Sequence, residues 1–243
     1  MTEWRLIENW GASPGFNMGL DEALLLSADA PPTLRLYTWK PDTLSLGYFQ
    51  RWVDVPGTSE AGAVVRRLTG GGAIHHVNEL TFSLTTAQND PLYRGKVADS
   101  YERIHGAIAR ALESFGATAT LAGDTPLASD VEGTGMCFHK STPLDLAWGG
   151  RKGVGSAQRR TRGRVLHHGS IKLGSSALEG SIATLDAVSA AGLDPARVGA
   201  ALCAALQAEF GLVLTPGDAS ERERSEAARL GPRHSERAFL ERR

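Results

Sequence analysis

Strand-like and helix-like patterns of apolar residues are interspersed along residues 1–215, and no repeat, low-complexity block or Pro/Ser-rich linker separates them. Elements mixed in this way predict a single α/β domain over residues 1–215. The 243-residue chain is long enough to bury a core without disulfides or a metal. Beyond Pro216 the composition changes to alternating charges. We therefore expect residues 216–243 to form a charged helical tail of one or two solvated helices, packed loosely on the domain.

Alternating apolar residues mark the expected strands. Leu34 and Leu36 alternate before the turn at Pro41-Asp42, and Leu44 and Leu46 alternate after it, so we expect two strands that are neighbours in one sheet. The same reasoning predicts further strands over residues 63–67, 80–84, 144–148 and 164–173.

Three helices are expected from their capping residues and apolar stripes. The first begins with Asn17 as N-cap, and the second runs from Ser100 to a closing Gly116. The third has Asp194 as its cap and Pro195 at its first position, and it ends at Phe210-Gly211.

The charge balance excludes several classes of partner. The chain has 26 Lys+Arg against 27 Asp+Glu, so it has no overall field for nucleic acid or for an anionic membrane. No apolar run approaches the ~18 residues of a transmembrane span. Only two cysteines are present, and the first residues lack a secretory signal pattern. We expect a cytoplasmic protein without a disulfide framework.

The segment Arg66–His76 places two arginines, a threonine and three consecutive glycines between expected strands. Glycines let backbone N–H groups approach a ligand closely, and arginines can hold a carboxylate or phosphate. An ordinary flexible turn is the alternative. The segment is not a Walker loop, because no Gly-Lys-Ser/Thr follows at the required spacing.

A second glycine-rich segment, residues 149–160, contains Lys152 in what we expect to be a loop between strands. A lysine there can contact an acyl carbonyl or a phosphate as a point charge, although a solvated basic hairpin is the alternative. His167 and His168 follow in an expected strand, where adjacent residues face opposite sides. At most one of them points into a given pocket, and we expect no metal site.

The two cysteines differ in their surroundings. Cys137 lies in a loop of small residues that leaves its thiol accessible, whereas Cys203, between Leu202 and Ala204 in a helix, is expected to be an inert core residue. A nearby cation makes a thiol nucleophilic, and Lys152 follows with room for one strand between them. A purely structural Cys137 remains the alternative.

Together these segments resemble the superfamily of lipoate–protein ligases, octanoyltransferases and biotin–protein ligases, from about residue 4 to about residue 173. The blocks that carry the resemblance are NMGLDEALL, PPTLRLYTWKPDTLSLGYFQ, RRLTGGGAIHH, GRKGVGSAQRR and HHGSI. The resemblance implies one α+β catalytic domain with mixed, mainly antiparallel sheets flanked by helices. It also implies transfer of an octanoyl or lipoyl chain to the lysine of a lipoyl carrier domain.

The resemblance assigns roles to particular residues. Lys152 would hold the acyl carbonyl, and Cys137 would be the nucleophile. The expected acyl-binding residues are Arg67, Thr69, Gly70, Gly71, Gly72, His76, Gly155, Ser156, Ala157, His168 and Gly169.

Within the superfamily, three features resemble the cysteine-dependent octanoyltransferase branch: Cys137-Phe138, the Glu79-Leu80-Thr81 segment, and a length with no room for an additional C-terminal domain. That branch implies octanoyl-acyl carrier protein as donor and no metal or nucleotide. An ATP- and Mg-dependent lipoate–protein ligase is the alternative, and a non-catalytic lipoyl-domain binder is a third. The chain departs from the family at Val77, where aspartate is usual, and at His75, where an apolar residue is usual.

The expected partners are acyl carrier protein and the lipoyl domains of glycine cleavage H protein or 2-oxoacid dehydrogenases. Neither nucleic acid nor membrane is expected. The acidic surface expected of such carriers would meet basic side chains beside the two glycine segments, namely Arg66, Arg67, Arg159 and Arg160.

Overall fold

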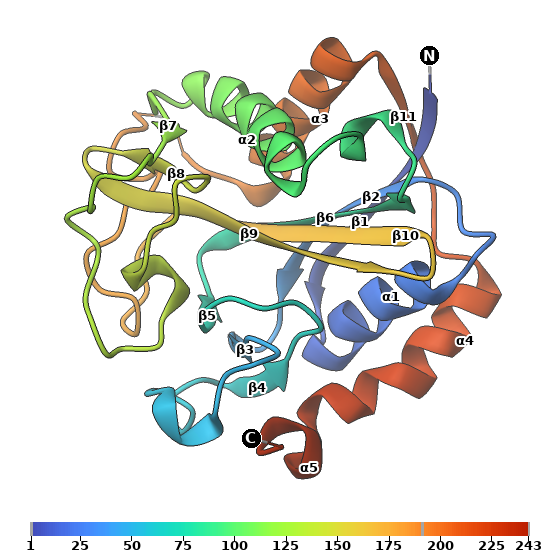
Figure 1. Ribbon diagram of the computed structural model, residues 1–243, viewed down its shortest axis with the longest axis horizontal. Coiled ribbons are helices and arrows are strands. Elements are labelled where there is room, and N and C mark those ends of the chain that lie inside the picture. Colours follow the sequence, from blue (N-terminus) through green and yellow to red (C-terminus); the bar gives the residue numbers. More distant parts are fainter. Residues whose placement is uncertain (1, 191, 243) are drawn as a thin grey trace.

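A computed structural model describes residues 2–190 and 192–242, and its centre is an eight-stranded sheet (Figure 1). The strand order is β11-β1-β2-β6-β10-β9-β8-β7. β1 pairs with β2 and β11 in parallel, and the other pairs in this sheet are antiparallel, as expected for a mixed, mainly antiparallel fold. The strands are β1 (Thr2–Ala12), β2 (Thr33–Trp39), β6 (Glu79–Ala87), β7 (Thr120–Leu121), β8 (Leu146–Trp148), β9 (Arg151–Thr161), β10 (Arg164–Lys172) and β11 (Leu212–Pro216).

A second sheet of three strands, β4 (Ala63–Arg66), β3 (Thr43–Leu46) and β5 (Ile74–His76), lies below the large sheet in Figure 1. The prediction that the strands on either side of Pro41 are sheet neighbours is therefore wrong. β2 pairs with β1 and β6 in the large sheet, whereas β3 pairs with β4 and β5 in the small one. Both strands are buried throughout almost their whole length, and alternation identifies a strand without identifying its partner.

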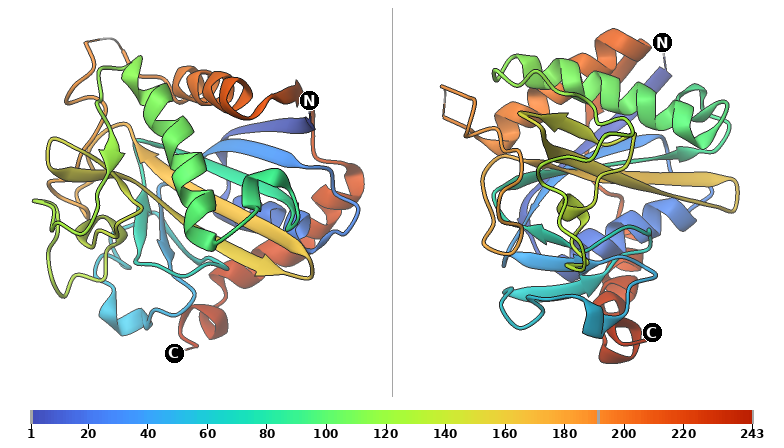
Figure 2. Two further views of the ribbon diagram at one scale, coloured as in Figure 1. Left: turned by 45° about the horizontal axis from the view of Figure 1, so that its top comes forward. Right: turned by 60° about the vertical axis from the view of Figure 1, so that its left-hand side comes forward.

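Helices cover both faces of the large sheet (Figures 1 and 2). On one face lie α2 (Val97–Glu113) and α3 (Pro195–Phe210), and on the other lie α1 (Pro14–Leu26) and α4 (Glu221–Leu230). α3 has the expected termini: the Asp194 side chain accepts a hydrogen bond from Ala196 N, and Gly211 closes the helix in the left-handed conformation with φ of 61°. Short turns of helix complete the chain: η1 (Trp52–Asp54), η2 (Pro91–Tyr93), η3 (Cys137–His139), η4 (Gly231–Ser235) and α5 (Arg237–Leu240).

The predicted start of the first helix is wrong. Ser13, not Asn17, is the N-cap of α1, and its side chain accepts a hydrogen bond from Phe16 N. Asn17 lies buried in the helix and donates to the carbonyl of Thr38. Pro14 after Ser13 is the same cap-then-proline signal that marks α3. Helix α2 also begins earlier than predicted, at Val97 instead of Ser100.

The segment after β11 forms α4, η4 and α5, and it packs closely on the domain, so the expectation of loose packing is wrong. A Cβ atom added to Gly19 of α1 would lie 2.3 Å from the Ala227 carbonyl oxygen of α4. His234 contacts the Arg66 carbonyl oxygen at 2.7 Å and Glu22 Oε2 at 2.8 Å. Small residues such as Gly19 and Ala227 allow α1 and α4 to pack closely, and the alternating charges of the tail do not indicate this packing. The domain boundary at residue 215 stays a prediction.

The main hydrophobic core lies between the large sheet and the pair α2 and α3, where Phe82, Ile108 and Leu202 are buried. Across residues 2–190 and 192–242, none of the helices combines the length and apolarity needed to cross a bilayer.

Candidate active site

The glycine segment forms the connection between β4 and β5, and Arg67 holds its shape. One Arg67 nitrogen, Nη2, donates to the carbonyl oxygens of Gly70 at 2.8 Å and Gly72 at 2.7 Å, and Nη1 donates to the Ser45 carbonyl at 2.9 Å. Burial lowers the pKa of Arg67 to about 10. Both Nη atoms of the guanidinium thus donate to backbone carbonyls and hold the turn, and a role of Arg67 in binding a ligand stays a prediction.

Cys137 begins the short helix η3 beside this turn. Its backbone N–H donates to the Ala73 carbonyl at 2.7 Å, and the Ala73 N–H donates to the Gly135 carbonyl at 2.8 Å. These two bonds tie the Cys137 loop to the glycine turn, although the two segments are more than 60 residues apart in sequence. Cys137 is a free, partly exposed thiol, and Cys203 is buried in α3, where burial raises its pKa to about 12.

Lys152 lies on strand β9, with its side chain beside Cys137. The prediction that residues 149–160 form a loop is therefore wrong, because only Gly149 and Gly150 lie outside the strand. Lys152 Nζ is 3.5 Å from Cys137 Sγ and 3.0 Å from the Cys137 carbonyl oxygen. The single strand expected between the two residues is β8. The glycines at positions 153 and 155 concealed the strand, because glycine is depleted in strands generally.

A buried carboxylate holds the Lys152 ammonium in place. Asp145 Oδ2 lies 2.7 Å from Lys152 Nζ, and the side chains are 6% and 2% exposed. Burial works against the charged ammonium, but the Cys137 sulfur and Asp145 outweigh it, so the pKa of Lys152 is raised. Asp145 also accepts from the Thr142 N–H and hydroxyl, which fixes the carboxylate independently of the lysine.

Two connected cavities meet at Cys137. A narrow pit of about 40 Å³ is lined by Met18, Tyr37, Trp39 and ten of the predicted site residues. Those ten are Arg67, Gly70, Gly71, His76, Cys137, Gly155, Ser156, Ala157, His168 and Gly169. A wide cleft of about 1350 Å³ is also lined by Cys137, and it reaches Gly72 and Lys152.

Thr69 lines neither cavity, but it contacts a residue that does. Its hydroxyl is 2.6 Å from His168 Nε2, and His168 Nδ1 is 3.3 Å from Asp21 Oδ2 on α1. Asp21 also accepts from Tyr37, Ser83 and Arg35. Burial disfavours this carboxylate, but Arg35 and His168 outweigh that effect and lower the pKa of Asp21 to about 2. The network fixes the orientation of His168 at the pit.

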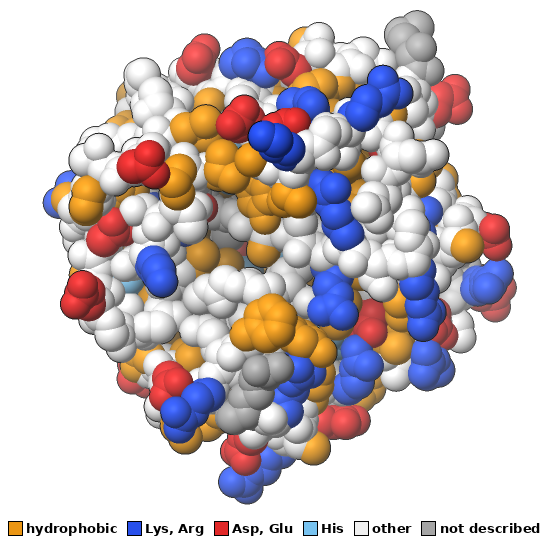
Figure 3. Space-filling view, viewed as in Figure 1, with side chains coloured by type: hydrophobic (Ala, Val, Ile, Leu, Met, Phe, Trp, Pro, Cys, Tyr) orange, Lys and Arg blue, Asp and Glu red, His pale blue; other side chains and the backbone are white. Residues whose placement is uncertain are grey.

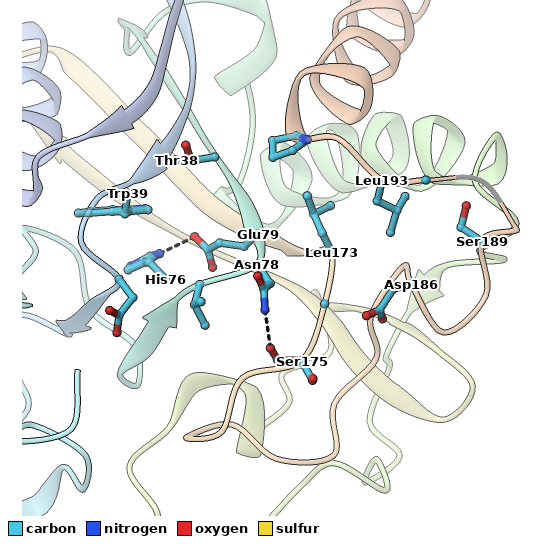
Figure 4. Close-up of a pocket in the computed structure, with 15 residues that line it drawn as sticks. Thr38, Trp39, His76, Asn78, Glu79, Leu173, Ser175, Asp186, Ser189 and Leu193 are labelled. Carbon is cyan, nitrogen blue, oxygen red and sulfur yellow. Dashed lines mark hydrogen bonds and ion pairs between the residues drawn. The ribbon is translucent and has the colours of Figure 1, made fainter. Parts of the chain in front are cut away.

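A second buried network of polar and aromatic side chains surrounds His76. Trp39 stacks on the His76 ring at 4.3 Å, and His76 Nδ1 contacts Glu79 Oε1 at 2.5 Å. Lys172 Nζ lies 2.9 Å from Glu79 and 2.7 Å from Glu179. Trp39 and His76 line both the pit and another hollow of about 790 Å³, which extends past Asn78 toward Leu193 (Figure 4).

Sequence reasoning missed several of these polar residues. Asp145 and Lys172 lie outside the motif blocks, whereas Asp21 and Arg35 lie inside NMGLDEALL and PPTLRLYTWKPDTLSLGYFQ, where neither had a predicted role. The available signal was their charge: an Arg or Lys within a strand that is buried on both faces requires a buried partner.

Of the arginines expected to meet a carrier, Arg66 does not face outward. It is fully buried, and it donates to the carbonyls of Gly47 at 2.7 Å, Gln50 at 2.8 Å and Phe239 at 2.8 Å. Arg67 is buried as well. Arg159 and Arg160 on β9 are partly exposed, and their guanidinium groups lie over the rings of Tyr48 and Tyr93.

Comparison with known proteins places this geometry in a family. Residues 13–193 match the lipoyl protein ligase A/B catalytic domain. The chain belongs to this family. A relative from Moorella thermoacetica, named octanoyltransferase LipM, is 42% identical over 177 residues, which cover 70% of this chain and 65% of the relative. Another octanoyltransferase LipM, from Symbiobacterium thermophilum, is 34% identical with 94% of each chain covered.

Solved structures agree on the lipoyl protein ligase fold. A lipoate protein ligase of T. acidophilum with bound lipoic acid has a TM-score of 0.81 at 20% identity, over 100% of both chains. Lipoate-protein ligase A bound with ATP has a TM-score of 0.79 at 20% identity, over 99% of both chains. At these identities the agreement establishes the fold only. Within the described residues, no group of three or more His, Cys, Asp or Glu side chains is arranged to hold a metal ion.

Proposed function

We propose that the protein is a cysteine-dependent octanoyltransferase that moves an octanoyl group from acyl carrier protein to the lysine of a lipoyl domain. In the first half-reaction the Cys137 thiolate attacks the thioester carbonyl of the donor. A new C–S bond forms to Cys137, the C–S bond to the carrier breaks, and the carrier leaves as a thiolate. In the second half-reaction the acceptor amine attacks the acyl-enzyme and releases Cys137.

The observation that carries this proposal is the Lys152 ammonium 3.5 Å from Cys137 Sγ. A cation at this distance stabilises the negative charge that develops on sulfur when Cys137 is the leaving group of the second half-reaction. In this proposal the same ammonium turns from the backbone carbonyls of Cys137 and Lys140 to the acyl carbonyl oxygen, where a charged donor contributes about 3 kcal/mol to the stability of an oxyanion. Cys137 also lines both the pit and the cleft, so an acyl group on its sulfur adjoins both cavities.

The pit is the proposed acyl site, and nine of the eleven predicted acyl-binding residues line it; Gly72 lines the cleft and Thr69 lines neither cavity. At about 40 Å³ it is smaller than the ~150 Å³ cavity that accommodates benzene in other proteins. An eight-carbon chain therefore requires side chains to move. Met18 on the pit wall is the most adaptable of them, because methionine is unbranched and has three rotatable bonds.

The cleft is the proposed entrance for both carriers. Arg159 and Arg160 lie on β9, which continues from Lys152 to Gln158 along the cleft wall. Figure 3 shows Lys and Arg side chains gathered on the right-hand part of the face that it draws. Acidic carrier surfaces would be attracted to them with a salt-dependent association rate. The solved T. acidophilum system pairs a bipartite lipoate protein ligase with its E2 lipoyl domain.

The proposed transfer starts from a thioester, so it needs neither nucleotide nor metal. It requires a reduced Cys137 thiol, which the cytoplasm maintains.

The test is intact-mass measurement after mixing the protein with octanoyl-acyl carrier protein in the absence of ATP. We expect an octanoyl adduct that hydroxylamine removes and that passes to an added apo-lipoyl domain. Cys137→Ser should form no adduct, whereas Cys203→Ala, a change at the buried cysteine, should behave like the wild type. Transfer by Cys137→Ser at the normal rate would refute the proposal. Product formed only with free octanoate, ATP and Mg²⁺ would establish the ligase route instead, and binding of carriers without any product would establish a non-catalytic binder.

A further inference from the structure

A chain of hydrogen bonds leads from the wall of the cleft to helix α2, and the proposed acyl transfer does not use it. Ser156 lines both the pit and the cleft. Its hydroxyl oxygen lies 2.7 Å from His105 Nε2 and 2.8 Å from His167 Nε2. His105 Nδ1 contacts the Leu144 carbonyl oxygen, and Gln158 Nε2 lies 3.0 Å from His167 Nδ1.

The partners fix the direction of every bond in this chain. A carbonyl oxygen only accepts, so His105 Nδ1 carries a hydrogen, and Nε2 of the neutral ring is an acceptor. Ser156 therefore donates its single hydroxyl hydrogen to His105 Nε2. The hydroxyl oxygen then accepts from His167 Nε2, and His167 Nδ1 accepts from the Gln158 amide. Each donor points along the chain toward His105.

We propose that Ser156 and His105 form a proton relay that takes the proton lost by the acceptor amine as it attacks the Cys137 acyl thioester. The inference rests on the proposed octanoyl transfer and assigns a route for the proton of its second half-reaction. A neutral amine forms the new C–N bond, and the C–S bond to Cys137 breaks, with the electron pair leaving on sulfur. One amine proton passes to Ser156 Oγ, and the original Ser156 hydroxyl proton passes to His105 Nε2.

The charges around His105 suit a group that accepts a proton briefly. Burial lowers the pKa of His105 to about 4, so the ring is a neutral acceptor at physiological pH. Asp145 favours the protonated ring and Lys152 disfavours it. The rings of Tyr101 and His167 lie 5.8 and 6.3 Å away. Burial, followed by the charges of His105, His168 and Arg160, lowers the pKa of His167 well below its usual value, so His167 is a neutral donor to Ser156.

His105 acts through Ser156, so it is a positioning residue and needs a test that a structural role would not satisfy. The two half-reactions can be measured separately: acylation with octanoyl-acyl carrier protein, then transfer from the isolated acyl-enzyme to an apo-lipoyl domain, both in single-turnover experiments. His105→Gln can still accept the Ser156 hydrogen bond, but its amide cannot take a proton. Ser156→Ala removes the link itself.

We expect both variants to acylate at about the wild-type rate and to transfer about 100-fold more slowly, a typical loss for general base catalysis. The double variant should transfer no more slowly than either single variant, because the two residues act as one unit. Ser100→Ala is the matched control. Ser100 is a buried serine of α2 that contacts Gln158 at 2.8 Å, beyond the far end of the chain, and its loss should change neither half-reaction.

Normal transfer by His105→Gln would overturn the relay, and so would equal slowing of acylation and transfer, since equal slowing indicates a structural role. Thermal melts of each variant identify any loss of folding, and Ser156→Ala then provides the second measurement. Absence of an acyl-enzyme in the wild-type protein would instead refute the proposed function, so the two failures are distinguishable.

Discussion

Replacing Asp145 by asparagine should leave Lys152 as a buried charge without its carboxylate partner. The two side chains are 2.7 Å apart and nearly inaccessible to water. Breaking such a pair by removing one member costs about 3–5 kcal/mol, because the remaining charge is uncompensated. At about 2–4 °C per kcal/mol for a chain of this size, the melting temperature should fall by about 6–20 °C. Octanoylation of Cys137 should slow as well, since the ammonium is no longer held beside the sulfur.

The control is the double variant Asp145→Asn, Lys152→Met, which removes both charges. It should recover most of the stability lost by the single variant while remaining inactive. The pKa of Lys152 is raised in the folded protein, so the pair stabilises the fold fully below the unfolded lysine value of 10.5 and loses this effect as the pH rises through the folded value. The difference between wild type and Asp145→Asn should therefore narrow in alkali. Urea unfolding at pH 7 and above pH 10 measures both effects. A single variant that costs less than about 1 kcal/mol, or a double variant that is no more stable than the single, would refute this reasoning.

Two further predictions concern stability. The pKa of Asp21 is lowered from 3.8 to about 2, a difference worth about 2 kcal/mol that is present above pH 3.8 and lost as the pH falls through 2. In urea unfolding between pH 2 and 7, Asp21→Asn should be less stable than wild type at pH 7, and the difference in free energy of unfolding should shrink in acid. A difference that does not change with pH would contradict the lowered pKa of Asp21. Gly19→Ala should destabilise the protein by more than about 1 kcal/mol, because the new Cβ would clash with the Ala227 carbonyl oxygen. Gly106→Ala in α2 should stabilise it by about 0.5–1 kcal/mol, because only the Arg110 side chain lies within 4 Å of the new Cβ and alanine favours a helix. Equal effects of the two glycine substitutions in thermal melts would contradict the close packing of α1 against α4.

Local signals in the sequence predicted the ends of α3, although they misplaced the starts of α1 and α2. Asp194, Pro195 and Gly211 gave the termini of α3, because caps and the left-handed glycine act within one turn of helix. Pairing between distant segments was less predictable. The alternation of Leu34 and Leu44 identified two strands but not their separate sheets, since an apolar residue on a doubly buried strand fits many neighbours.

The candidate site likewise has residues that sequence motifs identified and residues that depend on pairing between segments. Motifs identified Cys137 and Lys152, and the fold brings them within 3.5 Å of each other. The motifs could not identify Asp145, because its role depends on the pairing of β8, which it immediately precedes, with β9, which carries the lysine. Buried charges need partners, but the sequence alone does not say which carboxylate a buried lysine will meet.

The adjacent histidines of β10 show how far strand alternation reaches. The period of two correctly places them on opposite faces: His168 contacts Thr69 and lines the pit, and His167 contacts Ser156. Alternation does not explain the glycine that follows them. A Cβ at Gly169 would lie 2.7 Å from the Ser156 Cβ and 2.6 Å from the Gly155 carbonyl oxygen, so any side chain there would displace Ser156. Phe82 Cζ lies equally close, at 2.7 Å, so the glycine of the His-His-Gly segment is required by close packing against β9 and Phe82, which alternation alone does not reveal.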